Sequence, residues 1–125
     1  MRVYEIMNKA VVVEGGMSLK KAAQVMSSRN IGSLIVLNKN KVVGIVTERD
    51  ILKNVGKMSG KVSSIMSKSV ITVDEDESID NAALIMAEHK IKRLPVLSGG
   101  KLVGVVSATD VLANSDALNE SFLFD

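Results

Sequence analysis

The chain contains one sequence pattern twice. Residues 31–52 (IGSLIVLNKNKVVGIVTERDIL) align without a gap with residues 91–112 (IKRLPVLSGGKLVGVVSATDVL) at a shift of 60 positions. Ten of the 22 aligned pairs are identical: Ile31/Ile91, Leu34/Leu94, Val36/Val96, Leu37/Leu97, Lys41/Lys101, Val43/Val103, Gly44/Gly104, Val46/Val106, Asp50/Asp110 and Leu52/Leu112. Further upstream the shift is 59, because Ile6-Met7 aligns with Ile65-Met66. Such an internal repeat predicts one supersecondary unit built twice and packed against itself with pseudo-twofold symmetry.

The composition excludes several classes of protein. A chain of 125 residues, 46% of them hydrophobic, is long enough for one globular unit with a buried core. The net charge of +2 and only three aromatic residues argue against a nucleic-acid-binding protein. No apolar run is long enough to cross a membrane, and the N-terminus lacks the apolar region of a signal peptide, which favours a cytoplasmic location. Without cysteine there is no disulfide or zinc-thiolate chemistry.

Hydrophobic periodicity predicts a mixed α/β (α+β) fold of two tandem β-α-β-β-α repeats packed through their sheets. Apolar residues at helical spacing follow Ser18, a candidate N-cap, and β-rich runs flank short turn sequences. We expect helices over residues 17–29, 48–57, 78–89 and 108–113, and strands over residues 33–37, 41–47, 70–73, 93–97 and 101–107. The repeats are expected to occupy residues 1–57 and 58–114, with a C-terminal tail at 115–125.

The most informative motif is Gly-x-x-[Thr/Ser]-x-x-Asp, which is present as Gly44 to Asp50 and as Gly104 to Asp110. It places a hydroxyl where a strand runs into a helix and a carboxylate three residues later. One interpretation is a capping box, in which the two side chains bind each other's backbone N–H groups. The other is a binding shelf for a small molecule, because a carboxylate accepts hydrogen bonds from paired sugar hydroxyls. The duplication of the whole motif favours the second interpretation without excluding the first.

This repeated motif, preceded in the second copy by a hydrophobic strand containing Arg93-Leu94-Pro95-Val96, resembles a tandem pair of CBS domains, known as a Bateman module. The resemblance covers roughly residues 3–114. Similar modules are regulatory parts of cystathionine β-synthase, inosine-monophosphate dehydrogenase, chloride channels and the γ subunit of the AMP-activated kinase. The resemblance implies a stand-alone CBS pair with no catalytic part, which binds adenosine-containing ligands such as AMP, ADP, ATP or S-adenosylmethionine in two clefts between the repeats.

The resemblance also implies site residues. One cleft would hold ribose with Thr47 and Asp50, phosphate with Lys92 and Arg93, and adenine beside Val70, Ile71 and Thr72. The second would hold ribose with Ser107 and Asp110 and adenine beside Val11, Val12 and Val13. The second cleft has Gly32 and Ser33 at its phosphate positions, so we expect two unequal sites. Lys92 and Arg93 are equally compatible with solvated charges at the start of a strand.

We consider three classes of function for this sequence: a ligand sensor, a scaffold and an enzyme. A ligand sensor that signals to an unidentified regulated protein fits the motif best, and a ligand-independent scaffold is the alternative. An enzyme is disfavoured because the carboxylates are duplicated rather than differentiated into acid and base. The single histidine, His89, is expected to lie at a helix C-terminus and has no partner for a metal site. A homodimer is also expected, with Ile51, Leu52, Val111 and Leu112 as candidate contacts. The sequence does not identify the ligand, the occupancy of each cleft, the partner or the role of the tail.

Overall fold

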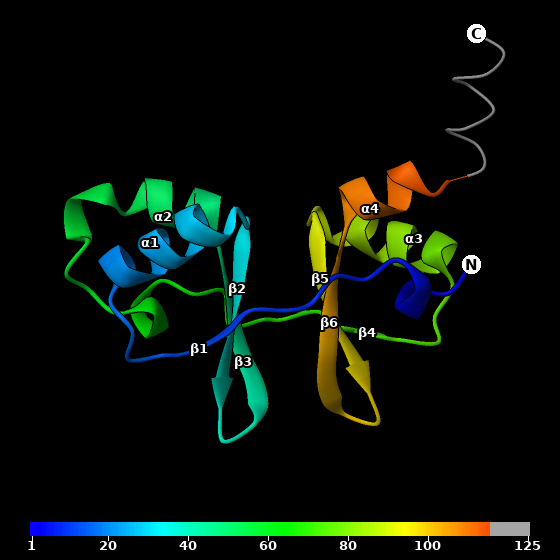
Figure 1. Ribbon diagram of the computed structural model, residues 1–125, viewed down its shortest axis with the longest axis horizontal. Coiled ribbons are helices and arrows are strands. Elements are labelled where there is room, and N and C mark those ends of the chain that lie inside the picture. Colours follow the sequence, from blue (N-terminus) through cyan, green and yellow to red (C-terminus); the bar gives the residue numbers. More distant parts are fainter. Residues whose placement is uncertain (116–125) are drawn as a thin grey trace, which may run out of the picture. The chain divides into compact units, whose positions relative to one another are not determined.

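The computed structural model describes residues 1–115, which form two compact units (Figure 1). Unit 2 consists of residues 10–70, and unit 1 consists of residues 1–9 together with the chain from Ile71 onward. The first nine residues therefore pack with the second sequence repeat rather than with the first. The predicted repeat boundaries at residues 57 and 114 stay predictions about the sequence, and residues 116–125 of the predicted tail lie outside the described residues.

Unit 2 is a three-stranded sheet with two α-helices. Its strands have the order β1-β2-β3, in which β1 runs parallel to β2 and β2 runs antiparallel to β3. The elements are β1 (Val12–Glu14), α1 (Leu19–Arg29), β2 (Ser33–Asn38), β3 (Lys41–Thr47), α2 (Glu48–Lys53) and the 3₁₀ helices Val55–Lys57 and Val62–Ser64.

Unit 1 repeats this arrangement, with strand order β4-β5-β6 and the same parallel and antiparallel pairings. Its elements are the 3₁₀ helix Val3–Glu5, β4 (Val73–Asp74), α3 (Ile79–His89), β5 (Arg93–Ser98), β6 (Lys101–Ser107) and α4 (Ala108–Ala113). Both units have the predicted order β-α-β-β-α, so the predicted mixed fold is confirmed. Within residues 1–115, every helix is too short or too polar to cross a bilayer.

The ends of the long helices follow from their sequences. The Ser18 hydroxyl accepts a hydrogen bond from the N–H of Lys21 at 3.1 Å, and Ser78 caps α3 in the same way. This confirms Ser18 as an N-cap. Each long helix is followed by a C-cap residue in the left-handed conformation, Asn30 with φ 52° after α1 and Lys90 with φ 55° after α3, which stops the helix and turns the chain toward the next strand.

Two predicted elements differ from the structure. The helix expected to reach residue 57 ends at Lys53, because the Asn54 side chain donates to the Asp50 carbonyl at 2.7 Å and a separate 3₁₀ turn follows. The strand expected over residues 70–73 is β4, which spans only Val73–Asp74. In unit 2 the Ile35 N–H donates to the Val11 carbonyl, but its counterpart Pro95 has no N–H to extend the pairing to Ile71.

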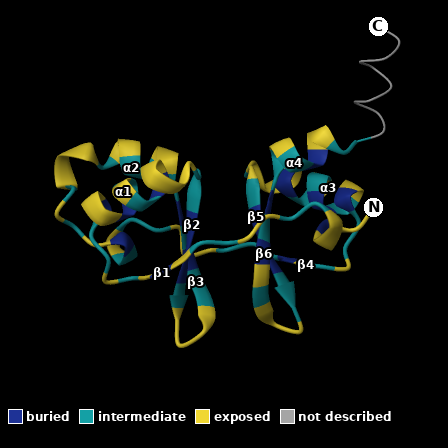
Figure 2. Ribbon diagram, viewed as in Figure 1, coloured by how far each residue is buried: buried dark blue, intermediate teal, exposed yellow. Residues whose placement is uncertain are grey.

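Each unit has its own hydrophobic core between its sheet and its helices (Figure 2). Leu19 and Leu34 in unit 2 and Leu94 in unit 1 are fully buried. Met26 and Met86 occupy equivalent core positions on α1 and α3. These cores fix the sheets and thereby the strand-to-helix junctions at the ends of β3 and β6.

Candidate functional site

The junction between β3 and α2 in unit 2 is a closed capping box. The Asp50 N–H donates to the Thr47 hydroxyl at 3.4 Å, and the Thr47 N–H donates back to Asp50 Oδ2 at 2.8 Å. The Thr47 hydroxyl also donates to Oδ2 at 3.1 Å. The capping-box interpretation of this motif is therefore confirmed.

The junction between β6 and α4 in unit 1 has the same geometry. The Asp110 N–H donates to the Ser107 hydroxyl at 3.1 Å, and the N–H and hydroxyl of Ser107 donate to Asp110 Oδ2 at 3.0 Å and 2.8 Å. A threonine and a serine therefore form the same local structure, because the motif needs only the hydroxyl.

The capping boxes occupy only one oxygen of each carboxylate. Within residues 1–115, every hydrogen bond to the side chains of Asp50 and Asp110 goes to Oδ2, and Oδ1 receives none. Both carboxylates are half-buried. An ionised carboxylate accepts through both oxygens, so the second oxygen can accept a ligand hydroxyl while the first caps the helix. The two interpretations of the motif are compatible.

The glycine of each motif makes room for a second segment of the same unit. Asn8 pairs with Val105 in an isolated antiparallel bridge, and Ser67 pairs with Ile45 at the equivalent position. A Cβ atom on Gly104 would lie 2.8 Å from the Asn8 carbonyl oxygen, and one on Gly44 would overlap the Met66 side chain. The glycines therefore bring the segments around residues 8 and 67 next to the junctions.

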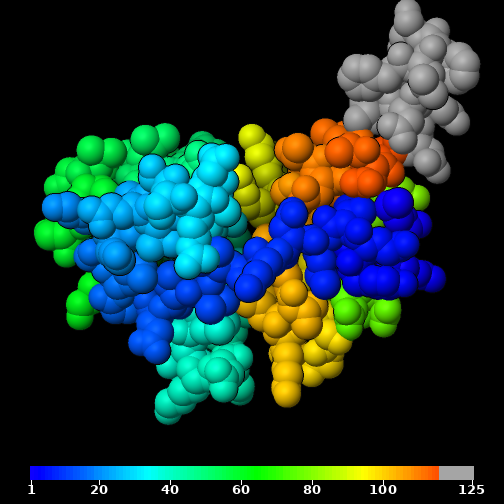
Figure 3. All heavy atoms as spheres, in the orientation of Figure 1, coloured from blue at the N-terminus to red at the C-terminus, as the bar shows by residue number. Residues whose placement is uncertain are grey.

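The sequence did not predict that Asn8 contacts the junction between β6 and α4. Its side-chain amide donates to Asp110 Oδ2 at 2.8 Å, although the two residues are 102 positions apart in the sequence. Figure 3 shows the N-terminal residues, in blue, packed against the orange residues of α4 within unit 1. The only sequence signal for this contact was the alignment of Ile6-Met7 with Ile65-Met66 at a shift of 59.

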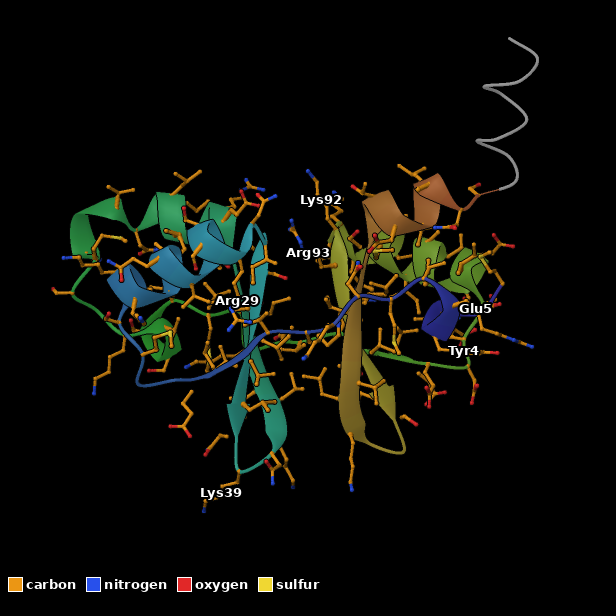
Figure 4. The ribbon with its side chains drawn as sticks, in the orientation of Figure 1. Tyr4, Glu5, Arg29, Lys39, Lys92 and Arg93 are labelled. Carbon is orange, nitrogen blue, oxygen red and sulfur yellow. The ribbon has the colours of Figure 1, made fainter. Side chains whose placement is uncertain are left out.

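Lys92 and Arg93 lie at the start of β5, beside the Ser107 junction (Figure 4). Arg93 pairs with Ser107 in the strand register, and the Ala108 N–H donates to the Lys92 carbonyl at 2.8 Å. In unit 2, Gly32 and Ser33 occupy the positions equivalent to Lys92 and Arg93, and Ser33 pairs with Thr47. Lys92 and Arg93 belong to the same unit as Ser107 and Asp110, whereas Thr47 and Asp50 belong to the other unit.

The predicted adenine segments divide between the two units. Val11, Val12 and Val13 lead into and form β1; the Val13 side chain is in the core, and Val12 is 45% exposed. Val70 ends unit 2, and Ile71 and Thr72 precede β4 in unit 1. Ile71 packs against the core of unit 1. The Val13 and Ile71 side chains therefore stabilise the cores, and Val12 and Thr72 retain accessible surface.

Comparison with known proteins identifies the family to which this chain belongs. The sequence pattern of the CBS domain matches residues 3–57 and again residues 62–116. The chain belongs to the CBS domain family. It contains two CBS domains in tandem, as the resemblance implied.

Relatives of this CBS pair include an uncharacterised protein and an enzyme. An uncharacterised 17.7 kDa protein of Acidianus ambivalens is 39% identical over 82% of this chain and 65% of its own length. The inosine-5′-monophosphate dehydrogenase of Thermoplasma acidophilum is 39% identical over 75% of this chain but only 19% of the enzyme. The chain therefore spans less than two thirds of these relatives, and the similarity to the enzyme covers the CBS part alone.

A solved CBS pair has the same fold and contains ligands. The CBS domain pair of protein MJ0100, in complex with 5′-methylthioadenosine and S-adenosyl-L-methionine, superimposes with a TM-score of 0.85 at 30% identity. The superposition covers 91% of this chain and 94% of the other. Both compounds in that complex contain an adenosine group.

Proposed function

We propose that this CBS pair is a sensor that binds an adenosine-containing ligand and signals the bound state to a partner protein. The observation that carries the proposal is the pair of equivalent junctions, each with a half-buried carboxylate whose Oδ1 has no hydrogen-bond partner within residues 1–115. A ribose offers two neighbouring hydroxyl donors, which suit such an acceptor. The adenosine compounds bound to the similar CBS pair support the same class of ligand.

Each group of residues has a separate role in the proposal. Asp50 and Asp110 accept from ribose hydroxyls, and Thr47 and Ser107 hold these carboxylates in place. The cationic side chains of Lys92 and Arg93 bind a ligand phosphate through charge-assisted hydrogen bonds. The segments Val11–Val13 and Val70–Thr72 contact adenine through their backbone and accessible side chains. The proposal assigns no catalytic residue and requires no cofactor.

Signalling follows from a shift in conformational populations. A ligand changes the balance between two conformations only by the difference in its affinity for them. A ligand that binds one conformation tenfold more tightly shifts the equilibrium by about 1.4 kcal/mol. The regulated partner, which the sequence does not identify, binds or responds to one of the two conformations. The cytoplasmic location stays a prediction of the sequence.

A thermal-shift and calorimetry panel tests the proposal directly. AMP, ADP, ATP, adenosine, S-adenosylmethionine and NAD are added separately to the purified chain, with GMP and cytidine monophosphate as controls for the base. A ligand at a hundredfold excess over its dissociation constant stabilises the folded state by about 2.7 kcal/mol. Stabilisation by adenosine compounds alone is expected, whereas no response to any of them supports the ligand-independent scaffold.

Replacing Arg93 with alanine is expected to weaken AMP binding by about tenfold or more and to leave adenosine binding almost unchanged. Hydrogen bonds to charged groups contribute about 1.5–3 kcal/mol, and adenosine has no phosphate to receive them. Calorimetric titration with both ligands measures the difference. Equal weakening of both ligands would show that Arg93 supports the fold rather than a phosphate.

The same variant identifies the carboxylate that shares a ligand with Arg93. AMP affinities of the double variants Arg93→Ala/Asp110→Ala and Arg93→Ala/Asp50→Ala are compared with those of the single variants. Residues that bind one ligand molecule as a unit give non-additive losses, whereas residues of separate sites do not. The cleft assignment implied by the family resemblance requires coupling to Asp50, and the placement of Arg93 beside Ser107 favours Asp110.

The chain is expected to form a homodimer through apolar side chains of α2 and α4. Leu52 is 72% exposed and Leu112 is 55% exposed, whereas Val111 belongs to the core of unit 1 and is not available. Leu52 and Ile51 also line a cavity of about 390 Å³ between α1 and α2, beside Ala23 and Met26. A twofold dimer is the commonest assembly that covers such a surface.

Sedimentation at micromolar concentration measures this assembly. The double variant Leu52→Glu/Leu112→Glu is expected to sediment as a monomer. Val103→Glu is the matched control, because Val103 is 41% exposed but lies on β6 rather than on a helix. A wild-type chain that is monomeric at this concentration would contradict the expectation.

A further inference from the structure

The two carboxylates differ in one hydrogen bond from outside their capping boxes. Asp110 Oδ2 receives the Asn8 amide at 2.8 Å in addition to the two donors of Ser107. Asp50 Oδ2 receives only the N–H and hydroxyl of Thr47. Because a carboxylate only accepts, the Asn8 amide must present its nitrogen to Asp110, which leaves its own oxygen and second N–H next to the carboxylate.

Asn8 has a fixed position relative to Asp110. Its backbone N–H donates to the Val105 carbonyl at 2.8 Å, and the Val105 N–H donates back to the Asn8 carbonyl at 2.9 Å. The absence of a side chain on Gly104 permits this close approach. The side chain is therefore attached to an anchored backbone, and its hydrogen bond to Asp110 requires little further ordering.

Ser67 has the equivalent backbone position in unit 2 but makes no such bond. Its N–H and carbonyl form the same bridge with Ile45, at 3.0 Å and 3.1 Å. Within the described part of the chain, the Asp50 side chain accepts only from Thr47. The backbone geometry is shared, so the difference between the units arises from the side chain at this one position.

We propose that Asn8 is a positioning residue that orients the Asp110 carboxylate for ribose hydroxyls and makes the Asp110 junction the more ribose-selective of the two. The inference rests on the proposed function. The final torsion of an aspartate side chain is broad, so a capping box with a single residue leaves the carboxylate some freedom of rotation. A third donor from another segment restricts that rotation, and a ligand hydroxyl then meets an Oδ1 atom that is already in place.

A purely structural role for Asn8 makes a different prediction. If the amide only attaches the N-terminal segment to α4, its loss lowers the stability of unit 1 and weakens all ligands to the same extent. If it positions Asp110, its loss weakens only ligands that have ribose hydroxyls. The comparison between adenosine and 2′,3′-dideoxyadenosine separates the two roles.

The test uses the Asp50→Ala background, in which Asp110 is the remaining ribose carboxylate, and measures binding by calorimetry and unfolding by melting curves. Asn8→Ala and Asn8→Ser are expected to weaken adenosine roughly 2- to 12-fold and to leave dideoxyadenosine unchanged. Serine is the residue that the other unit has at this bridge, so Asn8→Ser retains a side chain compatible with the backbone. Ser67→Ala is the matched control and is expected to change neither affinity.

The reciprocal exchange supplies a gain of function. In the Asp110→Ala background, Ser67→Asn is expected to tighten adenosine binding and not dideoxyadenosine binding. The inference is overturned if Asp110→Ala weakens adenosine but neither Asn8 variant does, or if the Asn8 variants weaken both ligands alike. Failure of the wild-type chain to bind adenosine would instead overturn the proposed function on which the inference rests.

Discussion

Replacing Asp110 with alanine is expected to weaken the binding of an adenosine ligand by roughly 10- to 150-fold. The variant removes hydrogen bonds from ribose hydroxyls to a charged acceptor, which contribute roughly 1.5–3 kcal/mol. Asp50→Ala is expected to have the same kind of effect at the other junction. Asp110→Asn retains one acceptor but loses the charge, so its affinity is expected to lie between those of wild type and alanine. Calorimetric titration of each variant measures these losses.

Stability must be measured alongside affinity, because each carboxylate also closes a capping box. Loss of a cap costs roughly 0.5–2 kcal/mol of folding free energy, so both variants are expected to melt at lower temperature. Ser78→Ala is the matched control. It removes a cap of α3, where the Ser78 hydroxyl accepts from the Asn81 N–H at 3.1 Å, without changing either junction.

The control distinguishes the two roles of the motif. If Ser78→Ala lowers the melting temperature but not the affinity, weakened binding in the aspartate variants reflects a lost ligand contact. Unchanged affinity in both aspartate variants would reduce the motifs to capping boxes and remove the main support for the sensor proposal. Weakening in only one would show which junction binds the ligand.

The repeated elements could be predicted from the sequence because their signals are local. Helical spacing after Ser18, turn residues between β-rich runs and the hydroxyl-to-carboxylate spacing at Thr47 and Ser107 each act within a few residues. The extent of β4 could not be predicted from its own residues, because Val70 to Val73 are as β-prone as the segment that forms β1. It depends on Pro95 in the neighbouring strand, which lacks the required N–H.

The candidate site was predicted only in part for the same physical reason. The Asp50 and Asp110 motifs are contiguous in the sequence, whereas the hydrogen bond from Asn8 to Asp110 is not. Asparagine at position 8 has no distinguishing local pattern, and its role depends on the packing of residues 1–9 with the second repeat. The motif glycine was recognised as part of the repeat, but its purpose follows from the segment that crosses it.

Replacing Gly104 with alanine is expected to destabilise the protein by about 1–3 kcal/mol, the range of an overpacked core. The added methyl group would lie 2.8 Å from the Asn8 carbonyl oxygen, and this backbone atom is held by its hydrogen bond from Val105. Either β6 or the N-terminal segment must shift. The midpoint of denaturant unfolding, at an unchanged slope, measures the loss.

Two other glycine variants provide a graded comparison. Gly44→Ala is expected to cost less than Gly104→Ala, because its new methyl group meets the flexible side chain of Met66 rather than a backbone oxygen. Gly16→Ala meets nothing within 4 Å and is expected to be neutral or slightly stabilising, since alanine restricts the unfolded chain. Equal effects of the Gly104 and Gly16 variants would show that the N-terminal segment does not pack closely on β6, and would remove the anchored position that the proposed role of Asn8 requires.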